Sequence, residues 1–316
     1  MSWWGRGGGP ALGYLFGLLG TLTLVKSAST LQAEQYLAPF ARGEKICAFA
    51  LSEPDAGTNS FNIKTTAVAE GGGFRINGNK WFITNIDNSD ALLLVAKTAP
   101  SGKEAVKSGS LSLFLIDLPN ESLDYTPIPK HGFNYYKSNQ LFIEDLFVPE
   151  SALVGTLGKG FASLAPTLNA ERLLVAAGSI GLARLALSSA VLYASERVVF
   201  DVPIGAHQAV QHPLAAAHAR LESAWWTVRQ AAAMEDQGDQ SAHATALANT
   251  AKYVAVEAAI DACYHSLQAH GGAGYAREYH QERWWREVQL FRLAPLTQQM
   301  TLNFIGQHVL GLPRSY

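Results

Sequence analysis

Between residues 44 and 155, hydrophobic and polar side chains alternate in short runs. Clear examples are FRINGNKWFIT at 74–84, ALLLVAKT at 91–98 and LSLFLIDL at 111–118, separated by clusters of Gly, Asn and Pro. Alternation with a period of two is typical of strands that bury one face. We therefore predict an antiparallel β domain at 44–157, with a hairpin in GGGFRINGNKW that turns at its NGN.

From about residue 160 the hydrophobic pattern is that of long helices. Four helices are predicted, at about 165–198, 208–237, 241–270 and 280–310. Pro213 is expected in the first turn of the second helix, where a missing N–H is harmless. Gly271-Gly272 is expected to end the third helix, and Pro295 to interrupt the last. Short connections between long helices predict an antiparallel four-helix bundle at 158–316.

Residues 10–43 also have a helical pattern, and their meaning is open between two interpretations. One Arg, an apolar stretch and small residues after it are typical of a secretory signal. The apolar stretch, about 15 residues long, is short for a membrane span, so no spanning helix is predicted. The polar residues that follow, Gln32, Glu34 and Gln35, favour a helix packed on the rest of the chain.

Composition narrows the class of protein. Of 316 residues, 48% are hydrophobic and only 16% are charged, which indicates a large buried core or subunit interface rather than disorder. The net charge of -2 gives no electrostatic basis for binding nucleic acid. Cys47 and Cys263 lie far apart and the histidines have no metal spacing, so we expect neither a disulfide framework nor a metal site, and a reducing, cytoplasmic location.

Four segments carry the most specific chemistry. They are ICAFALSEPDAGTNSF at 46–61, KWFITN at 80–85, ERVVFDVPIGAHQAVQH at 196–212 and QAHGGAGYAREY at 268–279. In the first, an apolar strand ends at Ser52, where a hydroxyl and free backbone donors could hold the polar edge of a flat ring. Taken alone, it could equally be a plain transition from strand to turn.

Together and in this order, the four segments resemble the motifs of the acyl-CoA dehydrogenase family. The resemblance covers about residues 20–316. It implies an α+β fold with a helical domain, a central β domain and a C-terminal helical bundle. Only a remnant of the family's N-terminal helical domain is expected, at 1–43.

The family resemblance also implies an activity and partners. Family members bind FAD non-covalently and oxidise an acyl-CoA thioester to the trans-2-enoyl-CoA, as in fatty acid β-oxidation. A carboxylate removes the α proton while the β hydride goes to the flavin. The expected partners are an acyl-CoA substrate, an electron-transfer flavoprotein or similar acceptor, and further copies of the chain in a dimer or tetramer.

Residues around the flavin ring follow from the same resemblance. The positions that line the ring are Phe49, Leu51, Ser52, Phe82 and Thr84. An aromatic side chain such as Phe82 is physically suited to cover a flat π system. The turn at Gly57 and Thr58 is expected to touch flavin phosphate and substrate.

The remaining cofactor residues lie in the helical part of the chain. Positions matching contacts to the FAD of a neighbouring subunit are Arg197, Phe200 and Gln208, and those matching contacts to the adenosine-pyrophosphate half are Gln268 and Gly272. Thr297 matches the threonine that touches the flavin, and Gln299, one turn beyond Pro295, is also expected to bind the cofactor. An Arg can meet a pyrophosphate through charged hydrogen bonds. Asp201 departs from the family, which usually has Gly there, and His280 stands where Pro is usual.

The catalytic base is the largest departure, because Pro295 stands where most of the family has its catalytic Glu. Proline also lacks the backbone N–H that helps to hold the thioester carbonyl, a donor worth roughly 3 kcal/mol. Isovaleryl-CoA and long-chain dehydrogenases place the base on an earlier helix, at the position of Glu171. That residue is either the base or a structural partner of Arg172, which is itself expected beside the substrate.

Three functions therefore follow from the sequence. The first is an FAD-dependent acyl-CoA dehydrogenase with Glu171 as its base. The second is a non-catalytic member, such as a partner subunit, which the substitution at Pro295 favours. The third is a flavin oxidase or monooxygenase on the same fold, since some relatives without the usual Glu do such chemistry.

Overall fold

The structure, a computed structural model, describes residues 11–98 and 111–314, and these form two compact units. The β unit contains residues 13–98, 111–130 and 134–168. Of the described residues, the helical unit contains 11–12, 131–133 and 169–314. The predicted α+β fold is confirmed, with the sheet in one unit and the helical bundle in the other.

An eight-stranded sheet forms the β unit, in the order β6-β7-β3-β2-β4-β5-β8 with β1 beside β4. The strands are β1 Cys47–Ala50, β2 Thr66–Glu70, β3 Gly73–Thr84, β4 Ala91–Thr98, β5 Leu111–Asp117, β6 Leu123–Pro127, β7 Ser138–Pro149 and β8 Leu153–Val154. The three strands predicted from alternation are therefore present. The sheet is mixed rather than wholly antiparallel, because β1 and β2 run parallel to β4.

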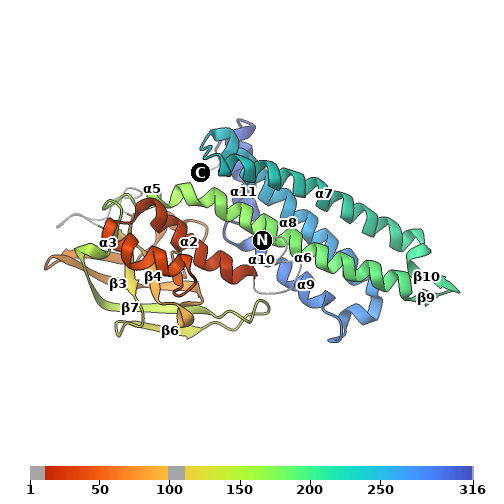
Figure 1. The fold of residues 1–316 in the computed structure, drawn as a ribbon, viewed down its shortest axis with the longest axis horizontal. Helices are drawn as coiled ribbons and strands as arrows, with labels where there is room; N and C mark the ends of the chain where they lie inside the picture. Colours follow the sequence, from red (N-terminus) through yellow and green to blue (C-terminus); the bar gives the residue numbers. More distant parts are fainter. Residues whose placement is uncertain (1–10, 99–110, 315–316) are drawn as a thin grey trace. The chain divides into compact units, whose positions relative to one another are not determined.

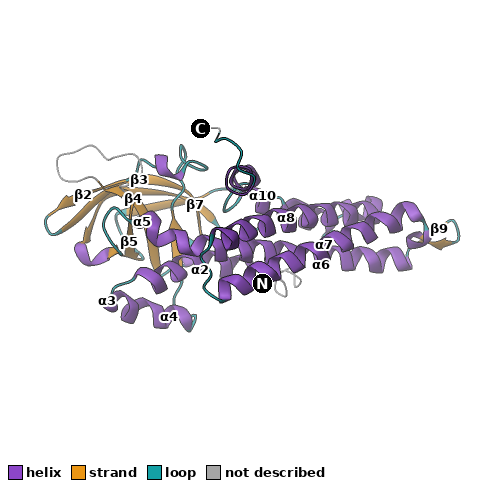
Figure 2. Cartoon of the chain, turned by 90° about the horizontal axis from the view of Figure 1, so that it is seen from above, coloured by secondary structure: helices purple, strands orange, loops and turns teal. Residues whose placement is uncertain are grey.

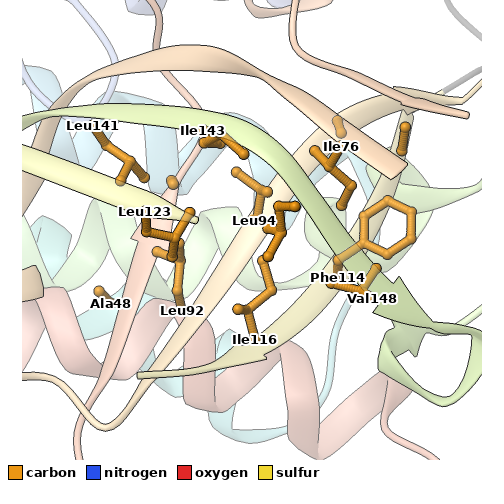
Figure 3. Packing of buried hydrophobic residues seen from close by; sticks show 14 of the residues in the cluster. Ala48, Ile76, Leu92, Leu94, Phe114, Ile116, Leu123, Leu141, Ile143 and Val148 are labelled. Atoms are coloured by element: carbon orange, nitrogen blue, oxygen red, sulfur yellow. The ribbon is translucent and has the colours of Figure 1, made fainter. Parts of the chain in front are cut away.

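Side chains that alternate along the strands fill both faces of this sheet. Leu92 and Leu94 of β4 and Phe114 and Ile116 of β5 join one buried cluster, shown in Figure 3. Leu93 and its odd-numbered neighbours point to the opposite face and join a second cluster. Both faces are therefore buried, which explains why residues 91–96 of β4 are all apolar.

Short helices cover the second face of the sheet (Figure 2). They are α2 Ala11–Ser27, α3 Thr30–Gln32, a π-helical turn Ala33–Leu37 and α4 Ala38–Ala41. The predicted helix at 10–43 is thus broken at Ser29, whose side chain accepts from the Gln32 amide while Gln32 accepts from the Ser29 amide. Leu24 and Tyr36 bury against the sheet, so these helices belong to the β unit.

The predicted hairpin turn at NGN is wrong. Asn77-Gly78-Asn79 lies inside β3, and the chain turns earlier, at Gly71 and Gly72, whose φ values are +56° and +81°. A pair of glycines adopts these angles without a steric penalty. Gly78 has another role, because a Cβ there would lie 2.3 Å from the Thr65 hydroxyl.

Three long helices dominate the helical unit and lie side by side in Figure 1. They are α6 Leu168–Glu196, α7 Gln208–Asp236 and α8 Ala242–His270. The fourth part of the bundle is segmented into α9 Gln281–Val288, α10 Leu290–Leu293 and α11 Gln298–Phe304. Buried alanines recur every seven residues, at Ala176, Ala183 and Ala190 on α6 and at Ala217, Ala224 and Ala231 on α7. Such small residues on the buried stripe let neighbouring helices approach closely.

Two predictions about helix ends can be compared with the structure: the end of α8 at Gly271 and the place of Pro213 in α7. Gly271 has φ +56° and ends α8, as predicted. Pro213 does not lie in the first turn of α7, because that helix already begins at Gln208. The start of α7 agrees with the predicted 208, so Pro213, five residues further on, lies inside the helix rather than in its first turn.

The stretch Gly160–Glu196 is long and apolar enough to cross a membrane by length and composition alone. Of its most apolar window, 61% is buried inside the protein. Core helices pass the same test, so the finding is weak evidence for a membrane span.

Candidate functional site

The β unit holds one group of predicted cofactor residues at the end of β1. Leu51 and Ser52 follow this strand directly and are fixed by β3, since the Trp81 amide donates to the Ser52 carbonyl at 2.8 Å. The Lys80 ammonium donates to the Leu51 carbonyl at 3.0 Å. Phe49 and Leu51 are half-buried against the helix-covered face of the sheet. Two neighbouring segments, 49–52 and 80–84, thus lie together as predicted.

A buried ion pair underlies this group. Glu53 and Lys80 are both buried, and Lys80 Nζ lies 2.9 Å from Glu53 Oε1. Burial lowers the pKa of Lys80 to about 8, against the opposing effect of the Glu53 charge. Burial alone would raise the pKa of Glu53, but Lys80 and the hydrogen bonds from Thr65 and the Lys64 amide bring it below its usual value.

Phe82 is turned out of the sheet. It has φ +59°, its side chain is 58% exposed, and its ring stacks on Trp81 with centroids 5.6 Å apart. The pairing of β3 with β7 shifts register between Lys80 and Ile83, and such a bulge re-aims a side chain. An exposed aromatic face beside a polar strand end suits a flat ring.

The other residues of this group present polar or open surface. The Thr84 hydroxyl lies 3.1 Å from that of Ser138. Gly57 and Thr58 are exposed in the turn after Glu53, and a Cβ built at Gly57 meets no atom within 4 Å. The turn therefore has room for a ligand close to its backbone.

In the helical unit, Glu171 lies in the first turn of α6. In the part of the chain that the structure describes, no hydrogen bond and no salt bridge within 4.0 Å engages its carboxylate. Its neighbour Arg172 donates instead to Asn169 Oδ1 at 2.9 Å. Adjacent residues of a helix do not face each other, which explains why Glu171 and Arg172 form no close pair.

Burial raises the pKa of Glu171 to about 7, and the Arg172 charge offsets this only in part. Some of the Glu171 side chain is nevertheless accessible to solvent. Arg172 Nε is buried without a hydrogen-bond partner among the described residues, and burial lowers the pKa of Arg172. An unpaired carboxylate whose pKa burial raises to about 7 has the properties of a general base.

Pro295 lies in the exposed connection between α10 and α11. The Ala294–Pro295 peptide bond is cis. Thr297 follows as the N-cap of α11, and its hydroxyl accepts from the Met300 amide at 3.2 Å. Gln299 is exposed in the first turn of α11. No ionisable group replaces the usual Glu at position 295 itself.

The third group lies at the far end of the bundle. Arg197 and Gln208 are exposed, and Phe200, in the short β9–β10 hairpin (Val198–Val199 and Val202–Pro203), is 85% exposed. Asp201 has φ +63°, which accounts for the family's Gly at this position, since Asp tolerates the left-handed region better than most residues.

Gln268 and Gly272 lie at this same end of the bundle, next to an aromatic cluster around His270. Tyr193 of α6 stacks on His270 of α8 with centroids 4.4 Å apart, so the ends of these two helices lie together. Gln268 is exposed, and a Cβ at Gly272 would meet no atom within 4 Å. Within the helical unit the predicted residues thus form two groups, one at each end of the long helices.

Sequence reasoning missed three buried charged residues that support these groups: Glu53, Lys80 and Lys252. Two of them lie inside the quoted motifs, but the sequence does not show that they pair. Among the described residues, no set of three His, Cys, Asp or Glu side chains is arranged to hold a metal ion. A groove on α7 and α8, lined by Tyr253, Tyr264 and Trp285 among others, includes none of the predicted site residues.

Comparisons with known proteins agree with the fold just described. The family "Acyl-CoA dehydrogenase, C-terminal domain" matches residues 158–310, and "Acyl-CoA dehydrogenase, middle domain" matches residues 48–146. Acyl-CoA dehydrogenase FadE12 of Mycobacterium tuberculosis is 40% identical over 287 residues, 90% of this chain and 72% of that protein. The caffeyl-CoA reductase-Etf complex subunit CarC of Acetobacterium woodii is 36% identical over 278 residues, 88% of this chain and 72% of that protein.

Solved structures show the same likeness. Butyryl-CoA dehydrogenase from Megasphaera elsdenii has a TM-score of 0.89 at 28% identity, covering 95% of this chain and 77% of that one. PigA with FAD and proline has a TM-score of 0.89 at 27% identity, covering 97% and 80%.

The fold and the family matches define an oxidoreductase of the flavoprotein class. This chain belongs to the acyl-CoA dehydrogenase family. The resemblance inferred from the four motifs is therefore confirmed, and FAD is confirmed as the cofactor of the family to which the chain belongs.

Proposed function

We propose that this protein is an FAD-dependent acyl-CoA dehydrogenase that uses Glu171 to remove the α proton of an acyl-CoA thioester. The observation that carries the proposal is the state of Glu171, whose carboxylate is unpaired and has a pKa raised to about 7 by burial. A carboxylate kept for structure would be expected to hold a close ionic or hydrogen-bonded partner.

The residues of both units fit FAD. Phe82 would cover the flavin ring, with Ser52 and Thr84 at its polar edge, and the open backbone at Gly57 would approach phosphate. In the helical unit, Thr297 and Gln299 would contact FAD at one end of the long helices. Gln268 and Gly272, at the other end, would contact the adenosine-pyrophosphate half of an FAD. When bound, FAD supplies the acceptor for the substrate's β hydride.

Glu171 performs the proton transfer in this proposal. With a pKa of about 7, roughly half of its population is ionised at neutral pH and can take the proton from the α carbon. Thr58 and Arg172 would each contact the substrate. Pro295 offers no N–H to the thioester carbonyl, so this chain supplies one donor fewer than usual, at a cost of roughly 3 kcal/mol in transition-state stabilisation.

The proposal extends to partners and to physiological role. The exposed Arg197, Phe200 and Gln208 support a homo-oligomer, a dimer or tetramer, in which they reach the FAD of a neighbouring subunit. An electron-transfer flavoprotein or similar acceptor would take the electrons, as the family resemblance and the name of the CarC relative support. The expected setting is fatty acid β-oxidation in the cytoplasm.

Flavin bleaching tests this function. The FAD-loaded protein is mixed anaerobically with a panel of acyl-CoAs of different length and branching, and the visible flavin absorption is followed. We expect at least one acyl-CoA to bleach the wild type, and Glu171→Gln to bleach about 10²–10⁴-fold more slowly with FAD still bound. Glu278→Gln, which changes an exposed Glu, is the matched control and should bleach like the wild type. A Glu171→Gln variant with full activity would refute the assignment.

A flavin oxidase or monooxygenase, or a non-catalytic partner subunit, is the second candidate, and Pro295 favours it because the usual base is missing there. Oxygen consumption without an added electron acceptor would support the oxidase. Absence of bleaching by every acyl-CoA, together with co-purification of a catalytic relative, would support the partner subunit.

A further inference from the structure

Lys252 is a buried lysine of α8 that the proposed reaction does not use. Its side chain is 0% exposed. Its ammonium donates to the Leu296 carbonyl at 2.8 Å and to Gln298 Oε1 at 2.9 Å, and both acceptors are neutral. Burying an ammonium is unfavourable unless its N–H donors are satisfied, so these hydrogen bonds offset the cost of burying Lys252.

The side chain of Gln298 also hydrogen-bonds to a carboxylate, that of Glu257. Its amide nitrogen donates to Glu257 Oε1 at 3.0 Å and to the Tyr253 carbonyl at 3.3 Å. Arg292 also donates to Glu257 Oε1, at 2.9 Å. Burial would raise the pKa of Glu257, but Arg292, Gln298 and the Lys252 charge lower it overall, so Glu257 stays ionised. The amide of Gln298 thus bridges a buried cation and a carboxylate.

These bonds fix both sides of Thr297. The Leu296 carbonyl is held on one side, and the buried Gln298 side chain on the other. Thr297 itself is tied into α11, because its hydroxyl accepts from Met300 and its carbonyl accepts from the Thr301 amide at 3.0 Å. The segment Leu296–Gln298 follows the exposed Pro295. The hydrogen bonds from Lys252 of α8 hold this segment in place.

We propose that Lys252 is a positioning residue of the active site, which holds Leu296–Gln298 so that Thr297 is presented to the flavin. The inference rests on the proposed function in one respect, namely that Thr297 meets FAD. The holding of the segment itself does not depend on FAD. The charge of Arg172, in the first turn of α6 next to Glu171, also contributes to lowering the pKa of Lys252.

Two measurements on Lys252→Met test the proposal, with Leu221→Ala as the control. The control removes buried apolar atoms from α7 and leaves every polar group named above unchanged. Hydrogen exchange of the Met300 and Thr301 amides is measured in the flavin-free protein. The Kd for FAD is measured by quenching of flavin fluorescence, at a temperature well below the melting temperatures of the two variants.

We expect Lys252→Met to speed exchange at Met300 and Thr301 by at least about tenfold over the control, and to weaken FAD binding by about tenfold. Exchange equal to that of the control would overturn the proposal. Faster exchange with an unchanged Kd would overturn it too, because the segment would then not serve flavin binding. If the wild type binds no FAD, the proposed function fails, and the exchange measurement alone decides whether Lys252 holds the segment.

Glu257→Gln provides a milder second variant if Lys252→Met does not fold. It weakens the far end of the same chain of bonds at a partly exposed position. We expect faster exchange and weaker FAD binding again, by smaller factors than for Lys252→Met. No change in either measurement would contradict the proposal.

Discussion

The two units each hold one wholly buried lysine beside predicted flavin residues, and the two lysines are satisfied differently. Lys80 of the β unit donates to the Leu51 carbonyl at 3.0 Å, and Lys252 of the helical unit donates to the Leu296 carbonyl at 2.8 Å. Lys80 meets a carboxylate, Glu53, at 2.9 Å. Lys252 meets the neutral amide of Gln298 at the same distance.

The difference shows that a buried charge can be compensated either by a carboxylate in direct contact or through a neutral amide that lies between the two charges. In the β unit both charges are buried, so each depends on the other. In the helical unit the amide carries the interaction to Glu257, whose side chain is 33% exposed and also paired with Arg292. Burial lowers the pKa of both lysines to about 8. Removal of a lysine should therefore cost more where it leaves a buried carboxylate behind.

The largest effect on stability is expected from Lys80→Met. It leaves Glu53 buried without its cation, so the free energy of unfolding should fall by about 3–5 kcal/mol, measured by urea denaturation. The double variant Glu53→Gln, Lys80→Met should recover much of this loss, since no buried charge then remains. A loss below about 1 kcal/mol in the single variant would show that the pair is not the buried unit described here.

A smaller loss is expected from Lys252→Met, about 1–3 kcal/mol, because it leaves only neutral acceptors without their donor. The same urea measurement applies. The comparison between the two lysines predicts this order, Lys80 above Lys252. Equal losses, or the reverse order, would break the comparison.

Glu171→Gln should change how stability depends on pH. The pKa of Glu171 is raised to about 7 in the folded protein, above its value in the unfolded chain. The folded state therefore binds more protons between these two values, and wild-type stability falls as the pH rises through that window. The variant lacks this loss, so above pH 7 it should be more stable than the wild type by about 1–2 kcal/mol, after allowance for solvent near the carboxylate. Thermal melts from acidic to alkaline pH would show parallel curves if the shift were absent.

Thr297→Ala should have the smallest effect on stability. It removes the N-cap of α11, at a cost of about 1 kcal/mol. Ser241→Ala removes the N-cap of α8 and should cost about as much, which makes it the matched control. Only the Thr297 variant should also weaken FAD binding in a fluorescence titration. Equal FAD affinity in the two variants would remove Thr297 from the cofactor site.

Much of the fold could be predicted because its determinants are local. The succession of apolar and polar runs located the strands Gly73–Thr84 and Ala91–Thr98, and Gly271 marked the end of α8. The errors arose where two local signals competed. Asn77-Gly78-Asn79 has turn chemistry, but Gly71-Gly72 satisfies the turn, and close contact with Thr65 requires Gly78.

From the sequence, the motifs could predict individual residues of the candidate site, but not the interactions between them. Phe82 is exposed and the backbone at Gly272 is open, and their roles at FAD stay predictions. The supporting bonds could not be predicted, because Lys80 is 27 residues from Glu53 and Lys252 is 46 residues from Gln298. Which partner a buried charge finds depends on how distant segments pack, and no local pattern records it. The division into domains at 1–43, 44–157 and 158–316 stays a prediction.

The pH dependence of flavin reduction tests the central claim, that Glu171 is the base, most directly. In single-turnover mixing with an acyl-CoA that bleaches the flavin, the wild-type rate should rise with pH through about 7 and then level off, because only ionised Glu171 accepts the α proton. Glu171→Gln should be slow at every pH, without this inflection. A wild-type rate that does not change across this range, or a variant that keeps both the rate and the inflection, would contradict the claim.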